Sequence, residues 1–357
     1  MRIGIPRERK VLEGRVGLIP AACADLVRNG HTVLLETDAG ERSGYPDEAY
    51  RQVGVEVVPT AAEVYGDGEL IIKVKEPVEE DLELLRREHL LFCYLHLAAN
   101  SELATRLQGI GLTAVGFETV QTKDGMLPLL APMSDIAGRL SVQMGCTLLY
   151  QPNQGKGLLL GGLPGAERGH VVIIGAGSAG SNAARVAAGL GATVTVFDRK
   201  RERLATMRNL GNNVTALYPY EDSLAGAVRG ADLLIGAVLI PGQRAPYVVS
   251  AAMVREMETG SVIVDISVDQ GGCVETTKPT DYAAPTYIWE GVVHCNITNL
   301  PGAVPRSASQ ALSAALMPYV PRLAQGAWRE VEPLAAGINV DAGELVHSGV
   351  RRALEAG

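Results

Sequence analysis

A chain of 357 residues is long enough for about two domains of ordinary size, and 47% hydrophobic residues are ample for packed cores. The net charge of -8 is spread along the sequence without a basic tail or an acidic block, which gives no support for nucleic acid or an anionic membrane as a partner. Glycine is frequent, with 41 residues, and aromatic residues make up only 4%, which favours an α/β protein over an aromatic-rich β-sandwich.

The five cysteines are scattered, odd in number and without a CxxC pair. This pattern argues against a disulfide framework, and the six histidines and five cysteines show no metal-ligand spacing. The start, MRIGIPRERK, has charges where a signal peptide needs an apolar stretch, and apolar runs such as LLIGAVLIP are shorter than the ~20 residues that cross a bilayer. We therefore expect a soluble cytoplasmic protein without a metal.

Short β-branched segments alternate with longer segments of helical period, which is typical of repeated βαβ units. In the first third of the chain we predict strands at 2–6, 32–38, 56–60, 70–75, 90–96 and 113–119. A second series follows at 170–175, 193–198, 213–218, 232–238, 261–267 and 292–297. The sequence therefore predicts an α/β fold with two doubly wound, Rossmann-like domains whose sheets are mostly parallel.

Two segments of helical period flank the second series of strands. The first, PMSDIAGRLSVQMGCTLLY, opens with Pro132 and Ser134 as helix-start signals, and the second, at 304–327, is interrupted by prolines. Because these connectors bracket one sheet, we expect the chain to leave the first domain, build the second and return. This predicts a discontinuous substrate domain at 1–130 plus 305–357 and a cofactor domain at 131–304, joined by connector helices around an interdomain cleft.

The stretch ELIIKVKEP at 69–77 looks like a buried strand but carries Lys73 and Lys75 near its end. If the strand continues to Lys75, both lysines share one face, because strand side chains alternate. Open parallel sheets bind ligands beyond the carboxyl ends of their strands, so this strand end can reach a ligand. We predict that Lys75 reaches the substrate, whereas Lys73 lies deeper and either pairs with an acidic group or extends to solvent.

Two further polar residues have the same position relative to predicted strands. Arg15 lies in the loop after the first strand, and His96 ends the fifth. Together with Lys75 they can bind a carboxylate, polarise a carbonyl and transfer a proton. Each also has an ordinary structural explanation, as a loop charge, a strand-end lysine or a buried histidine with satisfied hydrogen bonds, but their common position favours a site.

The segment HVVIIGAGSAGSNAARVAAGLGATVTVFDRK combines a strand, a GxGxxG motif, an Ala-rich helix and a second strand. Gly175 permits the tight turn, Gly177 lets the backbone approach a pyrophosphate, and Gly180 lets the helix and strand pack closely. The pyrophosphate then lies at the positive end of the helix. This context predicts a dinucleotide-binding site and hence hydride transfer.

Asp198, which ends the second strand of this unit, favours NAD over NADP. Its carboxylate can accept hydrogen bonds from the adenosine ribose and repels a 2′-phosphate. The neighbouring Arg199, Lys200 and Arg201 weaken this preference unless they only form a solvated turn. Arg203, one helical turn further, either faces the adenosine phosphates or is a surface arginine.

Three more residues near predicted strand ends complete the candidate set. Asp265 lies within an apolar strand, where a carboxylate needs partners, so we expect it to cap a nearby helix or loop. Asp269 follows that strand and is placed to face the interdomain cleft. After the last strand, Asn299 precedes a Pro-Gly turn that would come close to the nicotinamide half of the cofactor.

The order of RERKVLEGRVGLIP, KVKEP, LFCYLHLA, APMSDIAGR, GAGSAGSNAA, VDISVDQGG and NLPGAVPR closely resembles the L-alanine dehydrogenase family over essentially the whole chain. The resemblance implies a homo-oligomer, typically a hexamer, that interconverts L-alanine with pyruvate and ammonia using NAD. It implies that Arg15 and Lys75 bind the substrate and that His96 and Asp269 are catalytic. The implied cofactor contacts are Ser134, Gly175, Gly177, Ser178, Ala179, Gly180, Asp198, Arg203, Val238, Leu239, Ile266, Ser267, Val268, Asp269, Asn299 and Leu300.

The sequence departs from the family pattern at two places. NLPG stands where the family usually has NMPG, and Tyr220 lies where a serine commonly contacts the cofactor. Neither departure affects the implied catalytic groups, but the second leaves open whether Tyr220 replaces that contact.

Three alternatives remain open from the sequence. One is the nucleotide-binding portion of a proton-pumping nicotinamide transhydrogenase, a family that lacks the equivalents of His96 and Asp269. Another is an amino-acid dehydrogenase of the same superfamily that acts on lysine or saccharopine. The third is an NAD-sensing module without turnover, which would be expected to lack one of the four polar groups.

Overall fold

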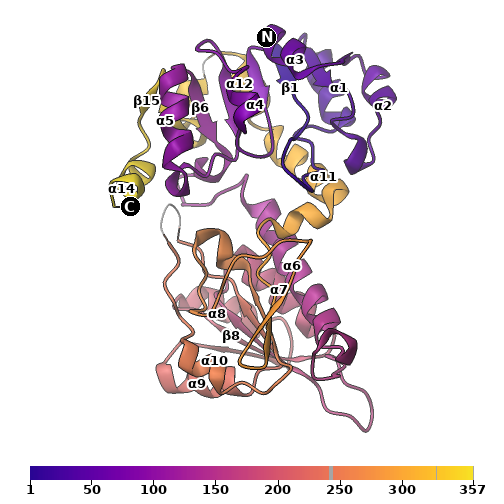
Figure 1. Cartoon of the computed structure of the whole chain (residues 1–357), viewed down its shortest axis with the longest axis vertical. Helices are drawn as coiled ribbons and strands as arrows, with labels where there is room; N and C mark the ends of the chain where they lie inside the picture. The colour runs from indigo at the N-terminus through magenta and orange to yellow at the C-terminus, as the bar shows by residue number, and fades with distance from the viewer. Residues whose placement is uncertain (241–243, 327, 357) are drawn as a thin grey trace. The chain divides into compact units, whose positions relative to one another are not determined.

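The computed structural model describes residues 1–240, 244–326 and 328–356 of the chain (Figure 1). It divides into two compact units, one formed by Met1–Met133 with Gly302–Gly357 and the other by Ser134–Pro301. Each unit is built around its own mostly parallel sheet with helices. The predicted fold class, two Rossmann-like α/β domains, is confirmed.

In the first unit, the described residues form one sheet with the strand order β15-β14-β6-β5-β4-β1-β2-β3. β1 pairs in parallel with both β2 and β4, so the strand order reverses at β1, and β4 pairs in parallel with β5. Loops that follow β1, β4 and β5 therefore leave the same edge of the sheet, which is where open α/β sheets bind ligands. The strands are β1 (Arg2–Ile5), β2 (Thr32–Glu36), β3 (Glu56–Val58), β4 (Leu70–Ile72), β5 (Leu90–Cys93), β6 (Thr113–Gly116), β14 (Ile338–Asp341) and β15 (Glu344–Leu345).

Helix α5 of the first unit begins and ends at recognisable capping residues. The Asn100 side chain accepts the Leu103 N–H at 3.0 Å at the start of α5, which ends at Gly111 in the left-handed region. Pro305 occupies the first turn of α11, where its missing N–H costs nothing. The helices are α1 (Pro20–Arg28), α2 (Asp47–Arg51), α3 (Ala61–Asp67), α4 (Glu79–Leu82), α5 (Ser101–Ile110), α11 (Pro305–Leu316), α12 (Val320–Ala324), α13 (Glu332–Ala336) and α14 (Ser348–Ala356), with 3₁₀ turns η1 (Glu41–Ser43), η2 (Leu97–Ala99), η3 (Phe117–Thr119) and η7 (Trp328–Glu330).

In the second unit, the described residues form a sheet with the order β12-β13-β11-β10-β7-β8-β9. β7 pairs in parallel with β8 and β10, so here the order reverses at the strand that precedes the glycine motif. The strands are β7 (His170–Ile174), β8 (Thr193–Phe197), β9 (Val214–Leu217), β10 (Leu233–Gly236), β11 (Val262–Asp265), β12 (Tyr287–Trp289) and β13 (Val292–His294).

The long helix α6 (Ala131–Leu148) packs closely on α7 in the second unit. A Cβ atom on Gly138 would lie 2.0 Å from the Ala179 carbonyl oxygen, so this contact requires glycine. The remaining elements are α7 (Ser178–Gly189), α8 (Arg201–Arg208), α9 (Glu221–Arg229) and α10 (Ala251–Arg255), with 3₁₀ turns η4 (Gln151–Asn153), η5 (Ile266–Gln270) and η6 (Leu300–Ala303).

Several details of the strand predictions were wrong. The stretch expected at 70–75 ends as a strand at Ile72, so the alternation of faces does not extend to the two lysines. The strands expected at 90–96, 113–119 and 292–297 end at Cys93, Gly116 and His294. Antiparallel strands β12, β14 and β15 were not predicted, and β14 pairs with β6 through an irregular register that spans the buried Asn339. The last residue of the predicted helical segment 304–327 lies outside the described residues.

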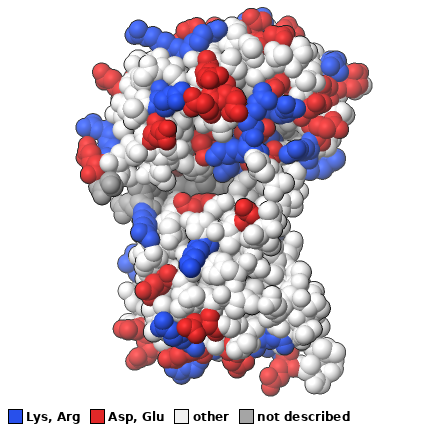
Figure 2. All heavy atoms as spheres, viewed as in Figure 1, with Lys and Arg blue, Asp and Glu red and all other residues white. Residues whose placement is uncertain are grey.

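The central strands of the two sheets are buried and, except for Asp265 at the end of β11, apolar. All four residues of β5, β10 and β11 are buried, as expected for parallel strands that are covered on both faces. On the face seen in Figure 2, basic and acidic side chains are interspersed over the first unit. None of the helices in the described part of the chain is long and apolar enough to cross a membrane.

Candidate active site

The two predicted substrate-binding residues and the predicted catalytic histidine of the first unit lie in loops at one sheet edge. Arg15 is in the loop between β1 and α1, Lys75 follows β4 by three residues, and His96 follows β5 by three residues. β4 is hydrogen-bonded to both β1 and β5, so these loops are neighbours. The common position predicted from the sequence is therefore present in the structure.

Arg15 is held by a carboxylate two residues before it. Arg15 Nε donates to Glu13 Oε1 at 2.7 Å and Arg15 Nη2 donates to Glu13 Oε2 at 2.5 Å, with both side chains at most 2% exposed. Arg15 Nη1 lies 3.2 Å from Met133 Sδ. A buried, two-bonded pair of this kind fixes the plane of the guanidinium group, which presents five donors in a rigid fork.

The Tyr94 side chain stacks on His96 and lies near the charge of Arg15. The Tyr94 and His96 rings are stacked, with centroids 5.8 Å apart and planes 10° from parallel. The Tyr94 hydroxyl donates to the Leu129 carbonyl at 2.6 Å, so this buried ring cannot easily move. Burial raises the pKa of Tyr94, and the nearby positive charge of Arg15 acts against that increase. The tyrosine ring is therefore a fixed stacking partner for the imidazole of His96.

His96 has an unusual backbone conformation for a residue with a side chain. Its φ of 51° and ψ of 30° lie in the left-handed region, which costs free energy outside glycine. Such residues persist only where the surrounding structure holds them, and they cluster at functional sites. The observation supports a functional position for His96.

The pKa of Glu76 is affected by the charges of both Lys75 and His96. Burial acts to raise the pKa of Glu76, but His96, Lys10 and Lys75 together hold it below its usual value. Glu76 Oε1 accepts a hydrogen bond from Lys10 Nζ, and Lys75 and His96 are both half-buried. Glu76 is therefore hydrogen-bonded to Lys10, and the charges of His96 and Lys75 are near enough to act on its pKa.

Lys73 is buried in an ion cluster and does not share the environment of Lys75. Its side chain is 1% exposed, with Nζ 3.1 Å from Asp81 Oδ2 and 3.5 Å from Glu8 Oε2. Burial alone would lower the pKa of Lys73, but the two carboxylates raise it above its usual value, so the ammonium group stays charged. The predicted deeper position of Lys73 is confirmed, and of the two predicted alternatives the structure shows the pairing with acidic groups.

Substituting each lysine by methionine should show that Lys73, but not Lys75, is needed for the stability of the fold. Lys73→Met leaves Glu8 and Asp81 as buried carboxylates without their cation, so we expect the free energy of unfolding to fall by about 3–5 kcal/mol. Lys75→Met, at a half-buried position, should change it by less than about 1 kcal/mol. Urea unfolding monitored by far-UV circular dichroism measures both, and equal losses for the two variants would contradict the assignment.

In the second unit, the glycine motif has the geometry that a dinucleotide requires. Gly175 has a φ of 99°, and a Cβ on Gly180 would lie 1.8 Å from the Gly175 carbonyl oxygen. A Cβ on Gly177 would meet only Arg203 Nη1, at 3.9 Å, so the space beside this backbone is open to a ligand. Ser178 and Ala179 form the first turn of α7, whose N-terminal amides attract phosphate. These residues fit a bound dinucleotide.

Asp198 is held beside the motif at the end of β8. Its Oδ2 accepts the Ala176 N–H at 2.8 Å and its Oδ1 accepts the Lys200 N–H at 2.8 Å. Arg203 Nη1 lies 3.4 Å from Asp198 Oδ2, so this arginine pairs with the carboxylate in the structure. The fixed carboxylate at this place is what ribose recognition needs.

The loop after β11 is organised by Asp265, as expected from its burial. Its carboxylate accepts the amide hydrogens of Ser267, Cys273 and Val274 at 2.8–3.1 Å and the Thr277 hydroxyl at 2.7 Å. The predicted capping role is confirmed. This anchored loop forms η5, which carries Asp269 with its side chain exposed.

The other predicted cofactor residues also lie at strand ends or helix starts of the second unit. Val238 follows β10, and its N–H donates to the Ser267 hydroxyl at 2.9 Å, which joins the loops after β10 and β11. The remainder are Ser134 in α6, Leu239 after β10, Ile266 and Val268 in η5, and Asn299 and Leu300 at η6. Tyr220 is 68% exposed at the start of α9, and its ring lies 4.9 Å from that of Tyr218.

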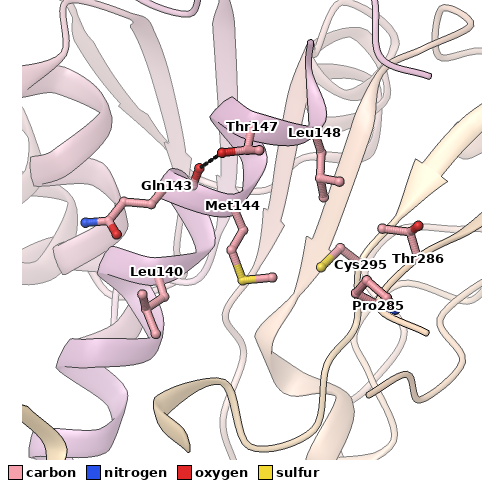
Figure 3. A pocket seen from close by; sticks show the side chains of 8 residues that line it. All are labelled: Leu140, Gln143, Met144, Thr147, Leu148, Pro285, Thr286 and Cys295. Atoms are coloured by element: carbon pink, nitrogen blue, oxygen red, sulfur yellow. Dashed lines mark hydrogen bonds between the residues drawn. The ribbon is translucent and has the colours of Figure 1, made fainter. Parts of the chain in front are cut away.

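A separate hollow of about 260 Å³ lies between α6 and the segment before β12 (Figure 3). Its lining is mainly apolar, and the dashed line in the figure is the hydrogen bond from the Thr147 hydroxyl to the Gln143 carbonyl, at 3.2 Å. The lining residues are Leu140, Gln143, Met144, Thr147, Leu148, Pro285, Thr286 and Cys295. None of them is a predicted site residue, so this hollow is not the candidate active site.

Sequence reasoning missed the carboxylates that surround the substrate residues. Glu8, Glu13 and Glu118 contact the segments that carry Lys75, Arg15 and His96. A signal was available, because each glutamate follows or ends a predicted parallel strand. The sequence position of these glutamates did not by itself predict a contact with the site, because glutamates in such loops are usually solvated.

Comparison with known proteins identifies relatives over the full length. The model of the family "Alanine dehydrogenase/PNT, N-terminal domain" matches residues 4–137, and that of "Alanine dehydrogenase/PNT, C-terminal domain" matches residues 141–348. "Alanine dehydrogenase 2" of Staphylococcus aureus (strain USA300) is 46% identical over 99% of this chain and 97% of its own length. "Alanine dehydrogenase" of Mycolicibacterium smegmatis is 44% identical over the same shares.

Solved structures agree with these relatives. A structure named L-alanine dehydrogenase superposes with a TM-score of 0.95 at 49% identity, covering 100% of this chain and 99% of that one. A transhydrogenase structure from Sinorhizobium meliloti, at 24% identity and a TM-score of 0.84 over 98% and 99% of the two chains, shows a shared fold alone. The resemblance found in the sequence motifs is thus confirmed, and the chain belongs to the alanine dehydrogenase/PNT family.

Proposed function

We propose that this protein is an oxidoreductase that catalyses the reversible oxidative deamination of L-alanine to pyruvate and ammonia with NAD. The observation that carries the proposal is the position of Arg15, Lys75 and His96 in neighbouring loops at one sheet edge. Tyr94 stacks on His96 and lies near Arg15, and Glu76 lies near Lys75 and His96. Full-length relatives named alanine dehydrogenase, at 44–46% identity, support the same reaction. The first unit then acts as the substrate domain and the second as the cofactor domain.

Arg15 and Lys75 bind and polarise the substrate in this proposal. The guanidinium group of Arg15, fixed by Glu13, binds the alanine or pyruvate carboxylate and so sets the orientation of the substrate. Lys75 donates to the carboxylate and to the carbonyl oxygen, which makes the carbonyl carbon more electrophilic toward ammonia. The two cations together favour a small substrate that carries a carboxylate.

His96 moves the protons of the reaction. An imidazole can accept and donate a proton at its ring nitrogens, so His96 can take a proton from the amine or the carbinolamine hydroxyl and return it in the reverse direction. The stacked Tyr94 ring sets the orientation of the imidazole plane. Asp269 stabilises the cationic imine and orients the attacking water or ammonia.

The second unit holds the cofactor by the glycine loop and Asp198. Bound NAD would supply the hydride acceptor of the reaction. Gly175, Gly177 and Gly180 would make room for its pyrophosphate, Asp198 would accept hydrogen bonds from its adenosine ribose, and residues of η5 would contact its nicotinamide half.

The experiment that tests the function is an absorbance assay of NADH formation at mildly alkaline pH. Purified protein is mixed with L-alanine and NAD, with L-lysine, glycine, D-alanine and NADP in parallel samples. NADH formed with L-alanine and NAD supports the proposal, whereas a faster reaction with L-lysine favours the lysine or saccharopine alternative. NAD binding without turnover in any sample would favour a transhydrogenase-like or sensing role.

Replacing Asp198 should relax the choice between NAD and NADP. In Asp198→Ser the repulsive carboxylate is gone, and Arg203, which lies 3.4 Å from it, becomes available to a 2′-phosphate together with exposed Arg199 and Lys200. Removing a like-charge contact of several kcal/mol should raise the NADP-to-NAD ratio of kcat/KM by at least about tenfold. Arg208→Ser, in the last turn of the same helix, serves as the control; an unchanged ratio in Asp198→Ser would contradict the assigned role.

We further propose that the chain forms a homo-oligomer, and the family resemblance implies that this oligomer is a hexamer. We also propose that the protein works in the cytoplasm. Light scattering coupled to size-exclusion chromatography measures the assembly directly. A mass near six times the 37.7 kDa of one chain would support the hexamer, and a monomer at assay concentration would contradict it.

A further inference from the structure

Each of the three substrate residues has its backbone N–H bonded to the carboxylate of a nearby glutamate. Glu118 Oε1 accepts the His96 N–H at 2.7 Å, Glu13 Oε1 accepts the Arg15 N–H at 3.1 Å, and Glu8 Oε1 accepts the Lys75 N–H at 3.4 Å. Glu8 and Glu13 lie in the loop after β1, and Glu118 lies after β6. The same arrangement therefore arises more than once around one candidate site.

The carboxylates of Glu8 and Glu118 accept backbone amide hydrogens just beyond the point where the hydrogen bonds between the β4 and β5 segments end. The last ladder bonds between β4 and β5 run from the Lys73 N–H to the Phe92 carbonyl, at 3.2 Å, and from the Tyr94 N–H to the Val74 carbonyl, at 3.1 Å. Beyond that point the chains turn away, and an amide hydrogen that is not in the ladder needs another acceptor. Glu8 also accepts the Val74 N–H at 2.6 Å.

Glu118 performs this task for His96, the residue with the least favourable backbone. Both its carboxylate oxygens accept the Leu95 N–H, at 3.2 and 3.1 Å, in addition to the bond from the His96 N–H. Hydrogen bonds from amides to a carboxylate are stronger than those to neutral acceptors. They hold the left-handed turn at His96 against its intrinsic cost.

We propose that Glu118, Glu8 and Glu13 are positioning residues, which clamp the backbone of His96, Lys75 and Arg15 so that these side chains meet the substrate in a fixed geometry. The proposal rests on the proposed dehydrogenase function and adds three residues to it. Glu118 acts through His96 alone and does not touch the reacting atoms. Its loss should therefore lower turnover through His96, with little effect on the binding of NAD in the other unit.

A double-mutant cycle between Glu118 and His96 tests this proposal. In Glu118→Ala we expect kcat with L-alanine and NAD to fall by up to about 100-fold, the effect of an ångström of misplacement, with an unchanged Kd for NAD. Glu118→Gln keeps a carbonyl acceptor and should fall by no more than about fivefold. Glu118→Asp keeps the charge but shortens the side chain, so its kcat should resemble that of the alanine variant. Glu83→Ala, at an exposed position, is the control and should leave kcat unchanged.

The decisive readout is the same substitution in a His96→Asn background. If Glu118 acts through His96, Glu118→Ala should cost less than about threefold there, because residues that act as a unit are not additive. Equal losses in both backgrounds, or no loss in either, would overturn the proposal. If Glu118→Ala does not fold, the Gln and Asp variants carry the same comparison. A wild-type enzyme without L-alanine turnover would instead count against the proposed function.

Discussion

The His96→Asn variant is expected to lose about 10²- to 10⁴-fold in kcat for L-alanine oxidation, because general acid–base catalysis contributes that range. Asparagine is the better replacement, since it tolerates the left-handed conformation that His96 adopts with φ of 51°. The amide has no group that titrates near neutral pH, so it cannot exchange the protons of the amine and the carbinolamine. Initial rates of NADH formation at saturating substrates measure the loss.

Controls must show that the loss belongs to proton transfer. The Kd for NADH, measured by NADH fluorescence, should stay within about twofold of wild type, because the cofactor residues lie in the other unit. The pH profile of kcat should also lose the limb that the imidazole contributes in the wild type. A His96→Asn enzyme with near-normal turnover would remove the central step of the proposed mechanism.

The glycine loop could be predicted from the sequence because its function is set by local backbone geometry. Gly175 adopts a φ of 99° and Gly180 approaches the Gly175 carbonyl, as the motif and its flanking strands indicate. Asp265 was also predictable, since a carboxylate within an apolar strand must find donors. In these cases the residue and its partners are close in sequence.

Other features could not be predicted, because they depend on long-range contacts. The strand that carries the two lysines stops at Ile72, where the loop from β1 brings in Glu8, a residue 65 positions before Lys73. β14 joins the sheet from the far end of the chain by pairing with β6, and its short INVD run gives a weak strand signal. The Glu118 contact with His96 likewise needs the order of the strands in space.

The Arg15→Met variant is the second case in which a large loss is expected. Without the guanidinium group the substrate carboxylate loses a charge-assisted, two-bonded partner, so kcat/KM for L-alanine should fall by about 10²- to 10³-fold. Arg15→Lys should recover only part of this loss, because an ammonium group keeps the charge but lacks the planar fork. Steady-state kinetics with varied L-alanine at saturating NAD measures both variants.

The same substitution also leaves Glu13 as a buried carboxylate without its main cation, so a loss of activity alone would not prove a role in binding. We expect Arg15→Met to lower the free energy of unfolding by about 3–5 kcal/mol, and a Glu13→Gln/Arg15→Met double variant to regain part of it. If the double variant regains stability while kcat/KM for L-alanine stays low, Arg15 binds the substrate. If both recover together, Arg15 serves the fold, and the carboxylate site must be sought at Lys75.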